Sequence, residues 1–150
     1  MEEQATAAPP TLEAEAVSLL QRLIRIDTVN PPGDERRLQE ELAAMLREAG
    51  FDCELLEAEP GRTNLLARLR GGDGPTLAYL GHVDTVRADP GEWTRDPWSG
   101  DLVDGWVWGR GALDMKGQVA SEVAAALELG RAGWRPEGEL LLVITADEEA

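Results

Sequence analysis

The sequence predicts an α/β fold in which a mostly parallel sheet is flanked by helices in layers. Apolar residues recur at helical spacing in three segments, around residues 12–24, 38–49 and 115–130. Extended apolar stretches alternate with these helical segments, which is the pattern of layered α/β proteins. The last stretch is continuously apolar from Leu140 to Ile144, as expected for a strand that is buried on both faces.

The composition favours a folded, acidic protein and argues against two classes of partner. The 150 residues are 43% hydrophobic and 29% charged, which is enough apolar material for a packed core. A net charge of -15 argues against nucleic acid and membranes as partners, because anionic phosphates would be repelled. The same charge is compatible with cation binding, although a solvated acidic surface is its commoner cause. The only cysteine, Cys53, rules out an internal disulfide and indicates a reducing compartment, which we expect to be the cytoplasm.

The first ten residues, MEEQATAAPP, are expected to form a flexible lead before a single domain at 11–150. They lack the basic and apolar regions of a secretory signal. No stretch of the chain approaches the 18 consecutive apolar residues that indicate a transmembrane helix. Behind the lead, Thr11 is placed to cap the first helix.

Turn-forming residues separate the first two helices, and strands follow them. The motif VNPPGD at 29–34 ends the first helix, Asp34 is expected to cap the second, and Gly50 is expected to end it. Three strand candidates come next, at 51–58, 63–70 and 75–82.

Residues 87–113 are rich in Pro, Gly, Asp and Trp and are expected to be irregular. Within them, Trp106 and Trp108 share a face if their segment is extended, which fits a hairpin. The tryptophans of this region are expected to pack it against the sheet, and the alternative is a substrate wall or a cation cage.

The only histidine, His82, ends an apolar stretch and stands two residues before Asp84. In an extended segment these two side chains lie on one face. A metal-binding histidine usually needs a carboxylate or carbonyl at its second ring nitrogen. Open α/β sheets also bind ligands at the carboxyl ends of their strands. The pair is therefore compatible with a metal site, although taken alone it fits a core-edge histidine beside a turn aspartate better.

Asp114 lies between a glycine-rich loop and the third helix. It can serve as the N-cap of that helix, or as a carboxylate that bridges two cations. The glycine spacing matches neither a phosphate loop nor a dinucleotide-binding loop. Lys116 stands at the start of the helix, where a cation is unfavourable, so we expect it to have a specific partner.

Three acids, Asp147, Glu148 and Glu149, follow the last apolar strand. Three carboxylates at one strand end repel each other, and a bound cation would offset that repulsion. The alternative is a solvated acidic loop. Together with His82 and Asp114 they supply nitrogen and oxygen ligands without a thiolate, which suits zinc, cobalt or manganese. Because Glu148 and Glu149 are adjacent, one of these glutamates can bind a metal ion while the other acts as a general base.

In their order and spacing, the stretches VNPPG, GHVDTV, WSGDLVDGWVWGRGALDMKG and TADEEA resemble the M20 family of zinc-dependent metallopeptidases. This family includes aminoacylase, acetylornithine deacetylase, succinyl-diaminopimelate desuccinylase and glutamate carboxypeptidase. The similarity covers nearly the whole chain from about residue 12. It implies the N-terminal part of a zinc-exopeptidase-like catalytic domain.

The resemblance also implies roles for individual residues. His82 is similar to a ligand of one metal ion, and Asp84 to the acid that orients its imidazole. Asp114 is similar to the aspartate that bridges two divalent ions, with a cis peptide expected after it. Glu148 matches the general base, and Glu149 matches a ligand of the second ion. The implied cofactors are two divalent ions, with zinc expected and cobalt or manganese as alternatives.

The implied activity is amide hydrolysis of N-acyl amino acids or short peptides by a metal-bound water. Family enzymes also have a later acidic ligand, a distal histidine and a lid domain, and the lid often supplies dimer contacts. None of these occurs before Ala150, so the sequence looks truncated. We expect the longer parent to be the enzyme and the 150 residues alone to be inactive, and the resemblance is compatible with a homodimer of the longer form. Two alternatives remain open, a non-catalytic protein that keeps the fold and binds metal or a partner, and an acidic α/β domain without metal.

Overall fold

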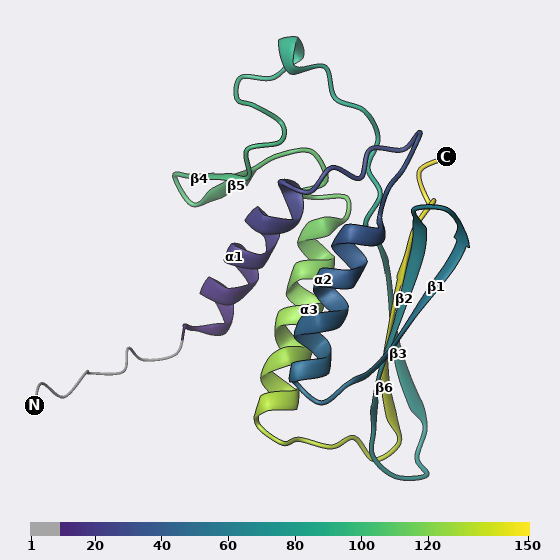
Figure 1. Cartoon of the computed structure of the whole chain (residues 1–150). Helices are drawn as coiled ribbons and strands as arrows, with labels where there is room; N and C mark the ends of the chain where they lie inside the picture. Colours follow the sequence, from purple (N-terminus) through teal and green to yellow (C-terminus); the bar gives the residue numbers. More distant parts are fainter. Residues whose placement is uncertain (1–9) are drawn as a thin grey trace, which may run out of the picture.

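The computed structural model describes residues 10–150, so the predicted flexible lead lies outside the described part except for Pro10 (Figure 1). The helical elements are α1 (Leu12–Ile24), α2 (Arg36–Glu48), η1 (Pro90–Glu92, a 3-10 turn) and α3 (Lys116–Arg131). The strands are β1 (Asp52–Glu59), β2 (Arg62–Arg70), β3 (Thr76–His82), β4 (Asp101–Val103), β5 (Trp106–Trp108) and β6 (Glu139–Thr145).

Four of the described strands form one sheet in the order β1-β2-β6-β3, with β6 between β2 and β3. β3 and β6 run parallel, and their register pairs His82 with Thr145 at the carboxyl ends. The pairs β1·β2 and β2·β6 are antiparallel.

The layered α/β fold is confirmed, but the expectation of a mostly parallel sheet is wrong for the described strands. Only Pro60 and Gly61 connect β1 to β2, and such a short connection allows only an antiparallel pair. Parallel pairing requires a crossover, which the chain provides between β3 and β6 through α3.

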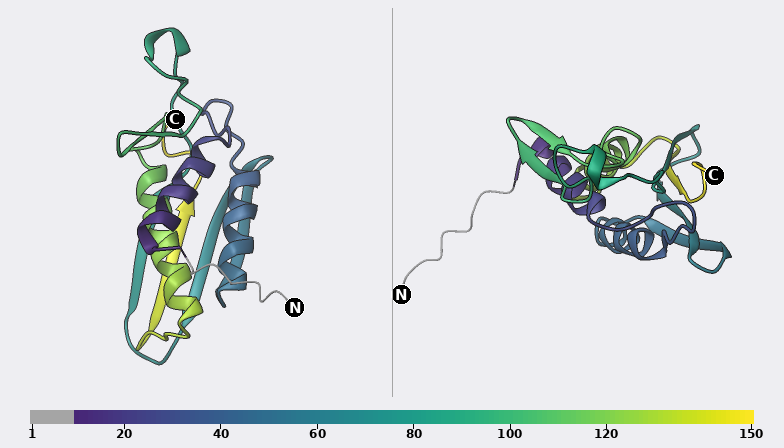
Figure 2. Two further views of the ribbon diagram at one scale, coloured as in Figure 1. Left: turned by 90° about the vertical axis from the view of Figure 1, so that its left-hand side faces the viewer. Right: turned by 90° about the horizontal axis from the view of Figure 1, so that it is seen from above.

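The three helices lie on the same face of the sheet (Figures 1 and 2). α2 and α3 pack directly on the strands, whereas α1 packs on the outer side of α3. β2 shows the resulting alternation, because every second residue from Thr63 to Leu69 is buried. The opposite face of the sheet carries no helix of the described residues, and Leu56 and Leu80 are exposed.

The starts of the first two helices differ in how their free N–H groups are satisfied. Thr11 caps α1 as predicted, because its hydroxyl accepts a hydrogen bond from the N–H of Ala14. The predicted cap of α2 by Asp34 is wrong. The N–H groups of Glu35 and Arg36 both donate to the carbonyl of Gly61, so the β1–β2 turn replaces a capping side chain.

Between β3 and α3 the chain leaves the sheet and forms η1 and the hairpin β4–β5 (Figure 1). The predicted hairpin is confirmed, with Trp106 and Trp108 on β5. It lies beside α1 rather than on the sheet, so the expected packing of these tryptophans against the sheet is wrong. The Arg95 guanidinium instead lies 5.7 Å from the Trp108 ring. Among residues 10–150, no helix combines the length and apolar character needed to span a bilayer.

Candidate metal centre

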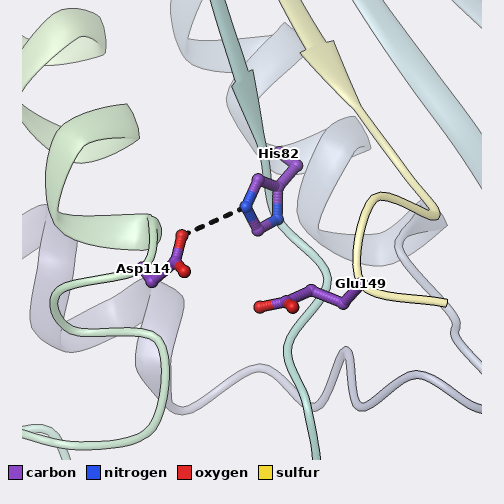
Figure 3. A group of neighbouring side chains, drawn as sticks. All are labelled: His82, Asp114 and Glu149. Atoms are coloured by element: carbon purple, nitrogen blue, oxygen red, sulfur yellow. Dashed lines mark hydrogen bonds and ion pairs between the residues drawn. The ribbon is translucent and has the colours of Figure 1, made fainter.

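The predicted ligands meet at one edge of the sheet because β3 and β6 are parallel neighbours. His82 is the last residue of β3, and the loop at 146–149 follows the last residue of β6. The loop before α3 brings Asp114 to the same edge, as Figure 3 shows. This is the carboxyl edge, where open α/β sheets bind their ligands.

The imidazole of His82 is buried and held by the residue two positions on. Its Nδ1 lies 3.2 Å from the carbonyl oxygen of Asp84 and 3.2 Å from carboxylate Oδ1 of the same residue. The carbonyl contact has the geometry of a hydrogen bond, whereas Oδ1 is not in an aligned one. Donation from Nδ1 leaves the lone pair on Nε2, the nitrogen that faces the other acids.

Asp84 is completely buried yet remains a carboxylate. Burial raises the pKa of Asp84, but hydrogen bonds from Asn30 and from the backbone of Glu149 and Glu148, with the nearby His82, outweigh burial and hold it below its ordinary value. The Nδ2 of Asn30 and the N–H of Glu149 each donate to Oδ2 at 2.9 Å. Asp84 therefore couples the position of His82 to the acidic loop.

Three acidic side chains lie near the imidazole of His82. Oδ1 of Asp114 lies 3.3 Å from this nitrogen, and Oε2 of Glu148 lies 3.7 Å from it. His82, Asp114 and Glu149 each offer a ligand atom, and the three atoms all lie within 4.8 Å of one another (Figure 3). The side chains of Asp114 and Glu148 are 75% and 61% exposed, so solvent and a substrate can reach them.

The donor set fits a divalent cation. It combines one oriented imidazole with several carboxylates, which is a set that zinc accepts. Two ligands at about 2.1 Å from one tetrahedral zinc ion lie about 3.4 Å apart. The 3.3 Å between Nε2 of His82 and Oδ1 of Asp114 matches that separation. A cation would also relieve the repulsion among Asp114, Glu148 and Glu149.

Asp147, the first of the three acids, does not join this group. Its carboxylate instead accepts hydrogen bonds from Arg62 at 2.7 Å and from Asn30 at 3.0 Å. Neither Arg62 nor Asn30 was found from the sequence. Asn30 lies in the VNPPG motif, so its place in that motif was a weak indication of a role at the site. No local sequence pattern indicates such a role for Arg62.

Asp114 does not cap α3, because the helix begins at Lys116 without a side-chain cap. The cis peptide expected between Asp114 and Met115 is present. Lys116 has the specific partners that its position required, since its Nζ donates to the carbonyls of Leu23 and Ile26, each at 2.9 Å. Burial lowers the pKa of Lys116 to about 8, although nearby acids oppose the change.

An α/β layer that gathers one histidine and several carboxylates at its strand ends is typical of metallopeptidases. Comparison with known proteins makes the class more specific. Residues 78–150 match the model of peptidase family M20/M25/M40. This match and the curated relatives described next confirm the resemblance to the M20 family that was predicted from the motifs.

Relatives of known sequence and structure agree with this assignment. The succinyl-diaminopimelate desuccinylase of Cereibacter sphaeroides is 44% identical over 135 residues, which cover 89% of this chain and 34% of that protein. The crystal structure of human carnosine dipeptidase 1 matches with a TM-score of 0.76 at 28% identity, over 95% of this chain and 36% of that one. An M20 family metallo-carboxypeptidase from Sulfolobus solfataricus matches in fold with a TM-score of 0.76 at 24% identity, over 90% of this chain and 31% of its own. The chain thus spans about a third of the length of the curated relatives that it matches.

Proposed function

We propose that residues 11–150 are the N-terminal part of the catalytic domain of a dinuclear metal-dependent hydrolase. Its substrates would be N-acyl amino acids or short peptides, in which it cleaves an amide bond. The family and the desuccinylase and dipeptidase relatives support a hydrolase with substrates of this kind. In this proposal the segment after residue 150 supplies the remaining ligands and a lid domain, and the complete protein pairs as a homodimer.

One observation carries the proposal. Ligand atoms of His82, Asp114 and Glu149 lie within 4.8 Å of one another at the carboxyl edge, with Glu148 also beside His82. Solvated acids repel one another and have no reason to converge on a buried, oriented imidazole. The convergence therefore favours a cation site over an ordinary acidic loop.

Each residue has a role in the proposal. His82 would ligate one cation through Nε2 while Asp84 orients its ring from Nδ1. Asp114 would bridge the two cations, and Glu149 would ligate the second. We expect zinc at both positions, with cobalt or manganese as alternatives, because the donors are nitrogen and oxygen.

The chain itself supplies the proton chemistry. Bound divalent cations would polarise the substrate carbonyl and acidify the attacking water. Glu148 would accept the proton of this water as it attacks the carbonyl carbon, and would pass a proton to the amine when the C–N bond breaks. The exposed position of Glu148, 3.7 Å from Nε2 of His82, suits a base that must reach both the water and the leaving group. The unpaired Cys53 is consistent with the cytoplasm as the proposed location.

The test begins with the intact mass of the protein from its source cells, because a value well above 16.3 kDa identifies the longer form to assay. That form is incubated with N-succinyl and N-acetyl amino acids and with dipeptides, and amine release is measured. We expect hydrolysis that a chelator abolishes and that zinc, cobalt or manganese restores. Glu148→Gln should lower kcat by about 10²–10⁴-fold while the bound metal content is unchanged.

Glu54→Gln is the matched control, because Glu54 is an acid on β1 away from the site. It should leave both metal content and hydrolysis unchanged. A native mass of 16.3 kDa with metal binding but no hydrolysis would favour a metal-binding protein. Equal metal content in the wild type and in His82→Ala would overturn the proposed centre altogether.

A further inference from the structure

The backbone of the acidic loop at 146–149 is anchored at both of its ends. The N–H of Ala146 donates to Oδ1 of Asn64 on β2 at 2.8 Å. The N–H of Glu149 donates to Oδ2 of Asp84 at 2.9 Å. The direction in which Glu148 and Glu149 point therefore depends on the backbone of the two residues between these anchors, Asp147 and Glu148.

Asp147 is the first of these two residues, and its side chain is held by Arg62 and Asn30, which are distant in the sequence. Its backbone has a φ of +66°, in the left-handed region that few residues other than glycine adopt. Its carboxylate accepts hydrogen bonds from Nη2 of Arg62 at 2.7 Å and from Nδ2 of Asn30 at 3.0 Å. A charge-assisted hydrogen bond is stronger than a neutral one, so this contact to the largely buried Arg62 favours the loop in an otherwise uncommon conformation.

The guanidinium of Arg62 is fixed on its other sides. Its Nε lies 3.0 Å from Oε2 of the fully buried Glu35, and its Nη1 donates to Oδ1 of Asn30 at 3.1 Å and to the carbonyl of Pro32 at 2.9 Å. The Arg62 side chain is only 14% exposed. A Cβ atom at Gly33 would lie 2.4 Å from its Cζ, so the glycine leaves the space that the guanidinium occupies. This planar fork contacts the 30–35 segment and Asp147 at the same time, in a geometry that the single ammonium of a lysine cannot reproduce.

The contact between Arg62 and Asp147 also reduces the electrostatic repulsion among the acids of the loop. Asp147, Glu148, Glu149 and the buried Asp84 are close in space, and four carboxylates without a cation would push the loop outward. Arg62 neutralises Asp147 and binds its carboxylate, so that of the three acids in the loop Glu148 and Glu149 are left for the candidate centre.

We propose that Arg62 is the positioning residue of this centre. It holds Asp147, and through Asp147 it sets the backbone that directs Glu148 and Glu149 toward His82. It contacts neither the cation site nor the substrate. This inference rests on the proposed function for its kinetic readout, but its readout of cation affinity does not depend on turnover.

The experiment uses the full-length protein and measures cobalt affinity from the visible absorption of the bound ion, together with kcat and KM. Arg62→Gln should lower cobalt affinity and kcat by about 10–100-fold, as loss of an outer-shell partner does, with KM within about threefold. The cobalt affinity and kcat of Arg62→Lys should lie between those of the wild type and of Arg62→Gln, because lysine keeps the charge but lacks the planar fork of the guanidinium. Asp147→Asn keeps a residue that tolerates a left-handed backbone, removes the charge, and should lower both quantities several-fold.

A matched control lies on the same strand pair. Arg68 pairs with Glu139 at 2.9 Å at the far end of β2 and β6, so Arg68→Gln should change neither affinity nor kcat. If Arg62 acts through Asp147, the double variant Arg62→Gln with Asp147→Asn should lose no more than Arg62→Gln alone.

The inference is overturned if Asp147→Asn matches the wild type, or if the two losses simply multiply in the double variant. It is also overturned if Arg62→Gln lowers only the melting temperature and leaves the cobalt spectrum and kcat unchanged. A wild-type protein that binds no cobalt and hydrolyses nothing would instead refute the proposed function.

Discussion

Lys116 is the only lysine of the chain, and its amine is completely buried. Its Nζ donates to the carbonyls of Leu23 and Ile26 at the end of α1, so it joins α1 to the start of α3. Burial lowers its pKa from 10.5 to about 8, against the opposing attraction of Asp27, Asp84 and Glu35. We predict that this one amine makes the stability of the protein rise with pH in the alkaline range.

The sign follows from proton binding. Between pH 8 and pH 10.5 the unfolded chain binds the Lys116 proton and the folded chain does not, so the free energy of unfolding rises with pH across this window. At about 1.4 kcal/mol per pKa unit, the fall from 10.5 to about 8 corresponds to about 3 kcal/mol. This stability is complete above pH 10.5 and is lost as the pH falls to 8.

Lys116→Met removes the titration and leaves two buried carbonyls without their donor. Each unsatisfied group costs about 1–3 kcal/mol, so above pH 10 the variant should be less stable than the wild type by several kcal/mol. Toward pH 7 the gap should narrow by about 3 kcal/mol, because the wild type then carries the cost of its buried charge. Cys53, whose pKa burial raises, titrates in both proteins and cancels in the difference.

Urea unfolding of both proteins with a chelator present, in steps from pH 7 to pH 10.5, measures this gap. A sample labelled with ¹³C in lysine gives a direct second measurement, because the chain has one lysine and therefore one Cε resonance. This resonance should titrate near pH 8 in the folded protein and near pH 10.5 in the unfolded protein. Parallel stability profiles, or a folded midpoint near 10.5, would mean that the amine is solvated and does not bind the two carbonyls.

Two further predictions concern the core and the centre. Leu142→Ala on the central strand, where the leucine is 1% exposed, should lower the free energy of unfolding by about 2–5 kcal/mol in urea titrations, and a loss below 1 kcal/mol would show that this face is not tightly packed. Zinc should raise the melting temperature of the wild type in proportion to the logarithm of its concentration, and a chelator should reverse the rise. His82→Ala should show no such response in the same calorimetric series, whereas an equal rise in this variant would place the bound ion elsewhere.

The sequence predicted those parts of the fold that depend on local periodicity. The helical spacing of apolar residues predicted α1, α2 and α3. Thr11 could be predicted as the cap of α1 because a capping side chain bonds to the backbone only three residues further along the chain. His82 and Asp114 were selected by their neighbours in sequence, and the structure brings them together because β3 ends where the loop before α3 passes.

The parts that were not predicted depend on contacts between distant segments. Asp34 looked like a cap for α2, but the carbonyl of Gly61 takes that place once the β1–β2 hairpin folds against the helix. The hydrogen bond of Arg62 to Asp147 spans 85 positions in the sequence, so no motif could show it. Sheet direction has the same cause, because the run of apolar residues in β6 fits a parallel or an antiparallel neighbour equally well.

The place of β6 in the sheet has a consequence for how the protein is made. β2 and β3 follow one another along the chain, yet they do not pair, because β6 lies between them. Until residues 139–145 have left the ribosome, both earlier strands have an open edge where their shared partner belongs. The β1–β2 hairpin is local and can form early, whereas the pairing of β2 and β3 with β6 waits for long-range contacts. In a nascent chain of this protein, the free edges of β2 and β3 are therefore open to edge-to-edge association until β6 emerges.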